Sequence, residues 1–291
     1  MDINYELYKV FYHVAKTLSF SEASKQLFIS QSAVSQSIKT LEKKLGQNLF
    51  IRSTKRVHLT PEGEILFKHI EPALHLIQKG ENQLLESDSL KGGQLRIASS
   101  DTICRYFLVP YLSKFHSLYP NIHIKVTNST SIECAKHLEN GEVDFIITNA
   151  PNSGLSGSMN VRPIREFHDV FVANAEYFPL SGQTVSLKQL LEYPILMLDR
   201  KSTTSEFLHS QFQKSNLDLV PEIELVSNDL LIDLARIGLG IAFVPDFCIP
   251  ANEKELFVLK LDKQFPSRNL IVAYNDALPV SQAAKQFMDM L

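Results

Sequence analysis

Polar and cationic side chains gather near the start of the chain, on a segment that is patterned as a helix. Apolar residues such as Val34, Ile38 and Leu41 recur at helical spacing, so residues 31–45 are expected to form a helix with one apolar face. The opposite face carries Gln31, Ser32, Ser35, Gln36 and Lys39. Glutamine can bond adenine through two hydrogen bonds, serine can bond base edges or phosphates, and lysine neutralises a phosphate. This pattern predicts a helix that reads the major groove of DNA.

A cationic hairpin is predicted directly after this helix. Residues 49–59 are typical of two short strands, and the polar tip between them carries Arg52, Lys55 and Arg56. These side chains are suited to bind backbone phosphates or to enter the minor groove. Either feature alone would be an ordinary solvated surface, but a polar helix face and a basic hairpin together favour DNA binding.

Two helices expected before residue 31 complete a motif. Residues 7–18 and 21–27 both have apolar residues at helical spacing. Ser30 is a suitable N-cap for the third helix and a further candidate for DNA contact, because its hydroxyl can accept from free N–H groups. Three short helices with a tight turn before the third, followed by a basic hairpin, describe a winged helix-turn-helix over residues 1–60.

The distribution of charge agrees with an anionic partner at one end of the chain. The 291 residues have a formal net charge of −3. Residues 1–60 hold nine Lys or Arg against four Asp or Glu, whereas residues 91–291 hold 18 against 22. A basic front segment on an otherwise acidic protein indicates that only this segment meets the anion.

Composition limits the class of protein further. Hydrophobic residues make up 44% of the chain, which excludes wholesale disorder. The three cysteines are odd in number and widely spaced, so neither a disulfide framework nor a zinc finger is expected. The N-terminus lacks a signal-peptide pattern, and no apolar run approaches the roughly 18 residues of a membrane span. We therefore expect a soluble, cytoplasmic protein with no membrane partner, metal or cofactor.

A long helix should link the DNA-binding domain to the rest of the chain. Thr60-Pro61-Glu62 combines a capping hydroxyl, a proline in the first turn and a carboxylate, and so predicts a helix start. The helix should run to about residue 85, with Pro72 kinking it, and residues 86–93 should be a hinge. One narrow face of this helix is apolar and consists of Leu66, Ile70, Ala73, Ile77 and Leu84. Such a seam suits contact with a second copy of the helix, so we expect a homodimer through residues 61–90.

Strands alternating with helices fill residues 91–291. Such alternation predicts two α/β lobes, each with a mostly parallel sheet covered by helices on both faces. We place lobe I at about 91–162 and 268–291, and lobe II at about 163–267. The whole chain therefore combines an α+β front domain with an α/β remainder.

These features resemble the LysR-type transcriptional regulators over essentially the whole chain. The similarity rests on the segments SFSEASKQL, SQSAVSQSIKTLE, LGQNLF and LTPEG, in this order and spacing between residues 19 and 63. Ser32 departs from the family pattern, because many members have proline there. The resemblance implies a winged helix-turn-helix, a dimerising linker helix and a two-lobed, periplasmic-binding-protein-like (type II) effector domain. It also implies a homotetramer that binds double-stranded promoter DNA and regulates transcription in response to a small-molecule effector.

The loops that follow the predicted strands are candidates for binding that effector. Ligands of open α/β sheets lie at the carboxyl ends of the strands, where helix N-termini favour anions. Loops at 99–102, 128–131 and 199–204 are rich in hydroxyls, and the third is cationic, so a small anionic effector is expected. Ser, Thr and Asn are also ordinary N-capping residues, and this alternative stays open for each of them. Matching the family pattern favours Ser100, Thr102, Asn128, Ser129, Lys201 and Thr203.

An alternative function is an α/β enzyme acting on a small anionic metabolite, with an appended DNA-binding module. It would need a paired acid and base or a nucleophile on converging loops, and only Asp101, Asp199 and Lys201 are candidates. They form no known motif, so no catalytic residue is expected. Cys104 and Cys134 lie near predicted helix starts, but burial as small hydrophobic residues is a better interpretation than redox sensing.

Overall fold

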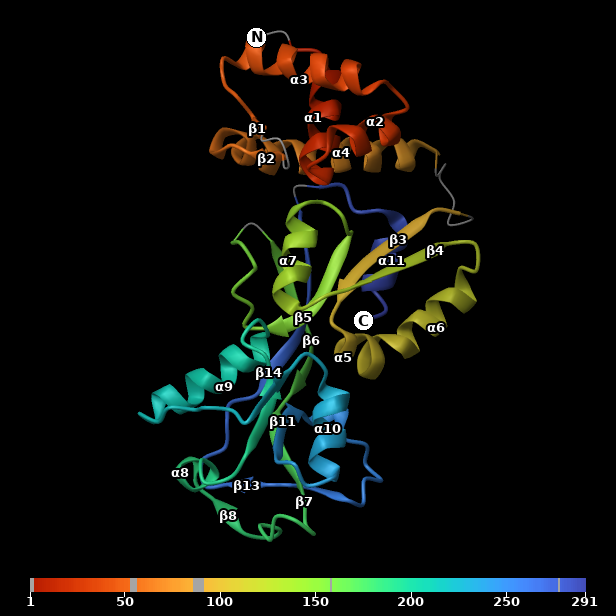
Figure 1. Cartoon of the computed structure of the whole chain (residues 1–291). Coiled ribbons are helices and arrows are strands. Elements are labelled where there is room, and N and C mark those ends of the chain that lie inside the picture. The colour runs from red at the N-terminus through yellow and green to blue at the C-terminus, as the bar shows by residue number, and fades with distance from the viewer. Residues whose placement is uncertain (1–2, 53–56, 86–91, 158, 277) are drawn as a thin grey trace. The chain divides into compact units, whose positions relative to one another are not determined.

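The computed structural model describes residues 3–52, 57–85, 92–157, 159–276 and 278–291. The chain divides into two compact units (Figure 1). The first contains Met1–Leu85, and the second contains Glu86–Glu139 and Val143–Leu291.

The first unit is a winged helix-turn-helix followed by a long helix. Its elements are α1 (Tyr5–Thr17), α2 (Phe20–Leu27), α3 (Gln31–Leu45), β1 (Phe50–Arg52), β2 (Val57–Leu59) and α4 (Pro61–Leu85). The Ser30 hydroxyl accepts from the Ala33 N–H and so caps α3, as the sequence predicts. Gly46 ends α3 at a φ of 70°, a left-handed conformation that favours glycine. Helix α4 continues through Pro72.

Aromatic side chains join the three short helices to the hairpin. The ring of Phe50 lies 5.5 Å from that of Phe11 and 5.8 Å from that of Phe20. Val34 and Ile38 of α3 are completely buried in the same cluster. The apolar face of α3 therefore points into the core, which leaves its polar face to the surface.

The second unit has two lobes, each built on a five-stranded sheet. In lobe I the strand order is β4-β3-β5-β14-β6. The strands are β3 (Gln94–Ser99), β4 (His123–Asn128), β5 (Phe145–Ala150), β6 (Asn160–Phe167) and β14 (Arg268–Tyr274). Its helices are α5 (Asp101–Ile103), the π-helix η1 (Cys104–Leu108), α6 (Val109–Leu118), α7 (Ser131–Glu139) and α11 (Gln282–Met288).

In lobe II the strand order is β10-β9-β11-β7-β12. The strands are β7 (Asp169–Asn174), β9 (Ile195–Leu198), β10 (Ile223–Leu225), β11 (Ile241–Pro245) and β12 (Leu256–Val258). Helices α8 (Leu187–Leu190), α9 (Thr203–Lys214), α10 (Asn228–Arg236) and the 3-10 helix η2 (Asp246–Cys248) accompany them, and β8 (Thr184–Val185) pairs with β13 (Lys260–Leu261).

Helices cover both faces of each sheet. In lobe I, α6 and α11 lie on one face and α7 on the other, and in lobe II α9 and α10 lie on opposite faces (Figure 1). Each face of each sheet packs against its helices through a separate apolar cluster. Phe115 and Phe287 belong to one cluster in lobe I, and Phe171 and Phe243 belong to one cluster in lobe II. The two-lobed α/β architecture is thus confirmed.

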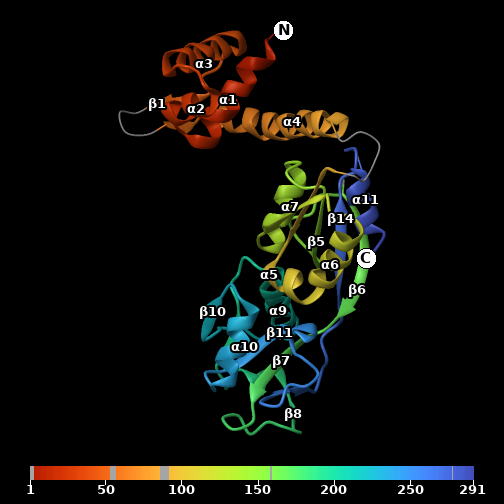
Figure 2. The same ribbon diagram turned by 90° about the vertical axis from the view of Figure 1, so that its right-hand side faces the viewer.

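The prediction of mostly parallel sheets is wrong. In lobe I, β3 pairs in parallel with β4 and β5, but β14 pairs antiparallel with both β5 and β6. Lobe II repeats this division, with β7 antiparallel to β11 and β12. The strands on which the chain passes between the lobes, β6, β7 and β14, all form antiparallel pairs. Strand β6 belongs to the lobe I sheet as far as Phe167 and β7 follows in lobe II, so the crossing comes at His168, later than the boundary expected at 162 (Figure 2).

Candidate functional site

The predicted DNA-reading residues share the solvent-facing side of α3. Gln31, Ser32, Gln36 and Lys39 are exposed, and Ser35 is half-buried. Ser30 is exposed as well, and its hydroxyl lies 2.9 Å from that of Ser32 while it caps the helix. A continuous face of amide, hydroxyl and ammonium groups is therefore available at the start of this helix.

The hairpin is only partly described. Arg52 ends β1, but its side chain lies outside the described part of the chain, as do Lys55 and Arg56 entirely. Sequence reasoning missed Glu42, whose carboxylate accepts from the backbone N–H groups of Leu49 at 2.8 Å and Phe50 at 3.3 Å. Glu42 thereby fixes the start of the hairpin against α3.

The residues of the apolar seam predicted on α4 are divided between the core and the solvent. Leu66 and Ile70 pack against the core of the first unit, so they are occupied within the chain. Ala73 and Ile77 of the predicted seam are exposed, and so are two large apolar side chains of α4 outside it, Ile65 and Leu76. A helical repeat identifies an apolar face but not which part of it the neighbouring helices cover, and Leu84 has no described side chain.

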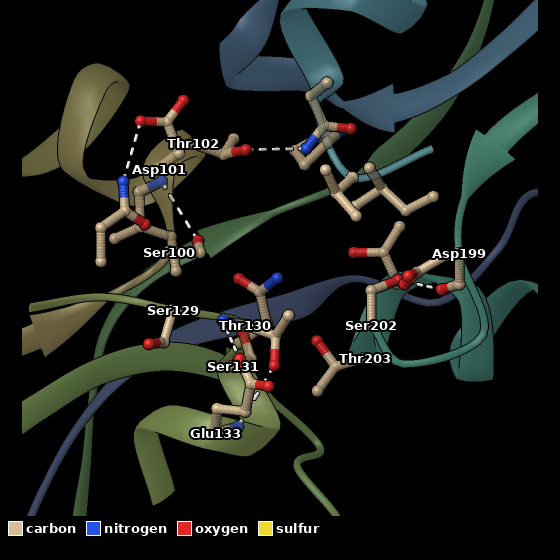
Figure 3. Close-up of a pocket in the computed structure, with 18 of the residues that line it drawn as sticks. Ser100, Asp101, Thr102, Ser129, Thr130, Ser131, Glu133, Asp199, Ser202 and Thr203 are labelled. Atoms are coloured by element: carbon tan, nitrogen blue, oxygen red, sulfur yellow. Dashed lines mark hydrogen bonds between the residues drawn. The ribbon is translucent and has the colours of Figure 1, made fainter. Parts of the chain in front are cut away.

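A cavity of about 330 Å³ opens where the two lobes of the second unit meet. Its lobe I wall comes from loops and helix starts at the carboxyl ends of β3 and β4 (Figure 3). Four of the predicted effector residues lie in this wall: Ser100, Thr102, Asn128 and Ser129. Ser100 also caps α5, since its hydroxyl accepts from the Ile103 N–H at 3.4 Å. The capping role and the cavity lining are therefore compatible at that residue.

The lobe II wall comes from the end of β9 and the start of α9. Thr203 lies in this wall, together with Asp199 and Ser202 (Figure 3). Thr204 lines the cavity as well. Lys201 was also predicted to contact the effector, but the structure does not place it among the residues that line the cavity. It is exposed in the turn before α9, where the Asp199 carboxylate accepts from its backbone N–H.

Side chains that the sequence did not identify join the two lobes beside the cavity. Asn228, at the start of α10, donates to the Thr102 hydroxyl at 2.8 Å and lines the cavity itself. The hydroxyl of Tyr106 donates to the Asp229 carboxylate at 2.5 Å, and burial is the largest cause that raises its pKa. The signal for Asn228 was its position at a helix start after a lobe II strand.

Arg268 occupies the crossing between the lobes. Its side chain is almost completely buried and pairs with Asp169 at 2.9 Å. The same guanidinium donates to the Thr204 hydroxyl at 3.3 Å and the Thr203 hydroxyl at 3.2 Å. Burial raises the pKa of Asp169, while the guanidinium opposes that rise. A buried cation thus supports the lobe II wall from behind.

The charge of the cavity differs from the expectation for an anionic ligand. Its described lining contains three carboxylates, Asp101, Glu133 and Asp199, and no Lys or Arg. Two buried amides, Asn149 and Asn228, also line it, and the Oδ1 atom of each has no hydrogen-bond partner in the described part of the chain. Apolar surface is contributed by Ile103, Leu198, Val226, Pro245 and Phe247.

The two cysteines of lobe I are protonated thiols at neutral pH. Burial raises the pKa of Cys104 to about 11 and that of Cys134 to about 12. Among the residues described, no three His, Cys, Asp or Glu side chains are grouped in a way that could hold a metal ion. None of the helices in that part of the chain is both long and apolar enough to span a bilayer.

Two protein families match the chain, and together they cover nearly all of it. Residues 5–64 match the family described as bacterial regulatory helix-turn-helix protein, lysR family. Residues 88–291 match the family described as LysR substrate binding domain. The DNA-binding face and the cavity fall in different family segments.

Relatives with assigned roles match over most of their lengths. The transcriptional activator CmpR of Synechocystis is 26% identical over 286 residues, which are 98% of this chain and 93% of CmpR. A probable RuBisCO transcriptional regulator of Trichormus variabilis is 28% identical over 92% of this chain and 82% of its own.

Solved structures share the fold. A full-length OxyR from Pseudomonas aeruginosa superposes with a TM-score of 0.73 at 18% identity, covering 99% of this chain and 94% of OxyR. Full-length CbnR complexed with its target DNA superposes with a TM-score of 0.67 at 17% identity, covering 99% of this chain and 98% of CbnR. The Synechocystis CcmR regulatory domain in complex with 2-PG gives 0.62 at 23% identity, covering 68% of this chain and 95% of the domain.

Proposed function

The chain belongs to the LysR family of bacterial transcriptional regulators, and from this premise we propose how its two units divide the work. The first unit binds promoter DNA through α3 and the hairpin. The second binds a small effector in the cavity between its lobes, and the occupied cavity changes how the protein binds or bends its operator.

In the DNA-binding unit, α3 enters the major groove with its exposed polar face toward the bases. Gln31, Ser35 and Gln36 are assigned to base edges, and Ser30, Ser32 and Lys39 to phosphates. Arg52, Lys55 and Arg56 of the hairpin are assigned to the backbone or the minor groove. Support comes from the orientation of α3, whose apolar side is buried in the core.

The observation that carries the effector role is a cavity lined by both lobes beside the crossing strands. A ligand that contacts both walls gains its full set of contacts in only one arrangement of the lobes, and so it selects that arrangement. The CcmR regulatory domain in complex with 2-PG supports small-molecule binding by this fold. Ser100, Thr102, Asn128, Ser129 and Thr203 are the proposed ligand contacts; Lys201 is left out because it does not line the cavity.

The active form is a homodimer through α4 and, in pairs of dimers, a homotetramer. The exposed apolar side chains Ile65, Leu76 and Ile77 provide the α4 contact. A dimer presents two copies of α3, so its operator should contain two half-sites about one helical turn, roughly 34–36 Å, apart or a multiple of that distance.

The protein acts as a regulator and not as an enzyme, and it acts in the cytoplasm, where promoter DNA is. Asp101 and Asp199 both line the cavity, but the third candidate for acid–base chemistry, Lys201, does not. The effector should therefore be recovered unchanged after incubation with the protein, as mass spectrometry can check.

Selection of binding sites from a random duplex DNA library tests the proposal without knowledge of the target genes. The full-length chain should enrich a sequence with two half-sites, and footprinting should protect both. Enrichment of a single unpaired half-site would contradict the dimer, and failure to enrich any sequence would contradict specific DNA binding by the first unit.

A further inference from the structure

Two hydroxyl groups in the lobe II wall are forced to act as hydrogen-bond donors. Thr203 and Thr204 are only 3% and 2% exposed, and both accept a hydrogen bond from Arg268. A guanidinium can only donate, so each hydroxyl proton remains free for another acceptor. Neither hydroxyl donates to a residue in the described part of the chain, and both line the cavity. This wall therefore offers two donors, polarised by a buried cation, to an anionic group.

The lobe I wall offers hydrogen-bond acceptors, where the lobe II wall offers donors. Asp101 and Glu133 accept single hydrogen bonds from neutral groups, the Asn128 amide at 3.0 Å and the Thr130 N–H at 3.2 Å. Within the described residues neither carboxylate forms an ion pair, so each has lone pairs available to a further donor. The buried Asn149 Oδ1 lacks a donor as well. An ammonium group supplies three donors and a positive charge, which are what this wall lacks.

We propose that the effector is a small zwitterion, an amino acid, whose carboxylate meets the Thr203 and Thr204 hydroxyls. Its ammonium group meets the Glu133 carboxylate and the buried Asn149 Oδ1 atom of lobe I (Figure 3). The idea rests on the proposed function and names the chemical class of its effector. A cavity of about 330 Å³ is near the small end of the usual range for ligand pockets and suits a molecule of this size. Ile103 and Phe247 leave apolar surface for its carbon skeleton.

A ligand with only one kind of charge fits less well. A dicarboxylate would place a second negative charge near Asp101 and Glu133, where no described Lys or Arg of the lining offsets the repulsion. A simple amine would leave the Thr203 and Thr204 hydroxyls without an acceptor in a buried wall, and unmade hydrogen bonds there are costly. A zwitterion satisfies both walls and also bridges the lobes.

The test uses the full-length chain and three matched sets of compounds. Pools of L-amino acids are compared with the corresponding 2-oxo acids, which lack the amine, and with the corresponding amines, which lack the carboxylate. At least one amino-acid pool should raise the melting temperature, because a ligand that binds only the folded state stabilises it. No shift from any amino acid, or an equal shift from the 2-oxo acids or the amines, would overturn the proposal.

Variants then locate the binding site by calorimetry with the most stabilising amino acid. Glu133→Gln and Thr204→Val should each weaken binding at least about tenfold, since each loses a charge-assisted hydrogen bond. The matched changes Asp218→Asn and Thr184→Val, at exposed residues that do not line the cavity, should leave the affinity unchanged. Equal affinities in all four variants would contradict this site.

Operator binding separates this inference from the proposed function. If the amino acid binds but operator affinity and bend stay the same, the ligand class is correct and effector control is not. If the operator responds to an anion without an amine, effector control is correct and the zwitterion is not.

Discussion

Asn228 of α10 donates to the hydroxyl of Thr102 on α5 at 2.8 Å, and this hydrogen bond connects lobe II to lobe I at the cavity. Both residues also line the cavity, so a ligand that bonds to either one acts directly on the contact between the lobes. Such a ligand can therefore change the balance between arrangements of the lobes through its difference in affinity for them.

The exposed face of α3 leads to a prediction about specificity. Gln36→Ala should remove about 1–3 kcal/mol of discrimination at particular base pairs, if the amide bonds a base edge. Lys39→Ala should weaken binding to all sequences alike and flatten its salt dependence, because it removes a phosphate contact. Titration of specific and random duplexes at several salt concentrations measures both. Equal losses on the two duplexes for Gln36→Ala would refute its role in base reading.

Gly63 leads to a prediction about stability. A Cβ atom at this position would lie 2.2 Å from the Leu49 carbonyl oxygen, so the backbone would have to move. Gly63→Ala should cost about 1–3 kcal/mol of unfolding free energy through overpacking. Gly80 lies in the same helix with nothing within 4 Å, and Gly80→Ala should instead stabilise by up to about 1 kcal/mol. Urea denaturation of both variants decides this, and equal effects would contradict the close packing at Gly63.

Phe28 leads to a prediction of increased stability on substitution. It is 95% exposed and ends α2 at a φ of 55°, so its ring buries almost nothing while its backbone is left-handed. Phe28→Asn should stabilise the DNA-binding unit by several tenths to about 1 kcal/mol, since asparagine adopts this conformation more readily. Phe11→Ala, in the core, should cost about 3–5 kcal/mol in the same thermal unfolding experiment. A clear loss of stability in Phe28→Asn would show that another surface covers the ring.

Glu253 gives a pH-dependent prediction in lobe II. The hydrogen bond from Arg236, at 2.8 Å, is the largest cause that lowers the pKa of Glu253 below its usual 4.5. A lowered folded-state pKa contributes stability that is fully present above the ordinary pKa and is lost as the pH falls through the folded value. Urea denaturation should show wild type more stable than Glu253→Gln at pH 7, with the difference shrinking toward acid pH. A difference independent of pH would contradict the ion pair.

Local structure was largely predictable because local chemistry determines it. The polar face of α3, its Ser30 cap and the helix start at Thr60 follow from periodicity and from the free N–H groups of a helix end. The antiparallel pairing of β14 with β5 and β6 was not predicted, because alternation of strands and helices does not determine which distant strands become neighbours.

The cavity could be placed from the sequence only where strand ends mark it. Ser100 follows β3 directly, Asn128 ends β4 and Thr203 begins the helix after β9, and the structure brings all three to one lining. Arg268 gave no such signal, since its partners Asp169 and Thr203 are 99 and 65 residues away. Loop composition does not determine which way a side chain of the loop points, and Lys201, predicted from composition and family pattern, does not line the cavity.

Effector control of DNA binding is most directly tested by an operator duplex from the selection experiment, labelled with dyes at both ends. The compound that raises the melting temperature is titrated onto complexes of wild type and of Thr102→Val, which keeps the shape of the side chain but removes its hydroxyl. Wild type should show a change in operator bend or a change in affinity of about 5–150-fold, the usual range of allosteric coupling. Thr102→Val should not respond to the compound. A full response in Thr102→Val, or none in wild type, would contradict effector control through this cavity.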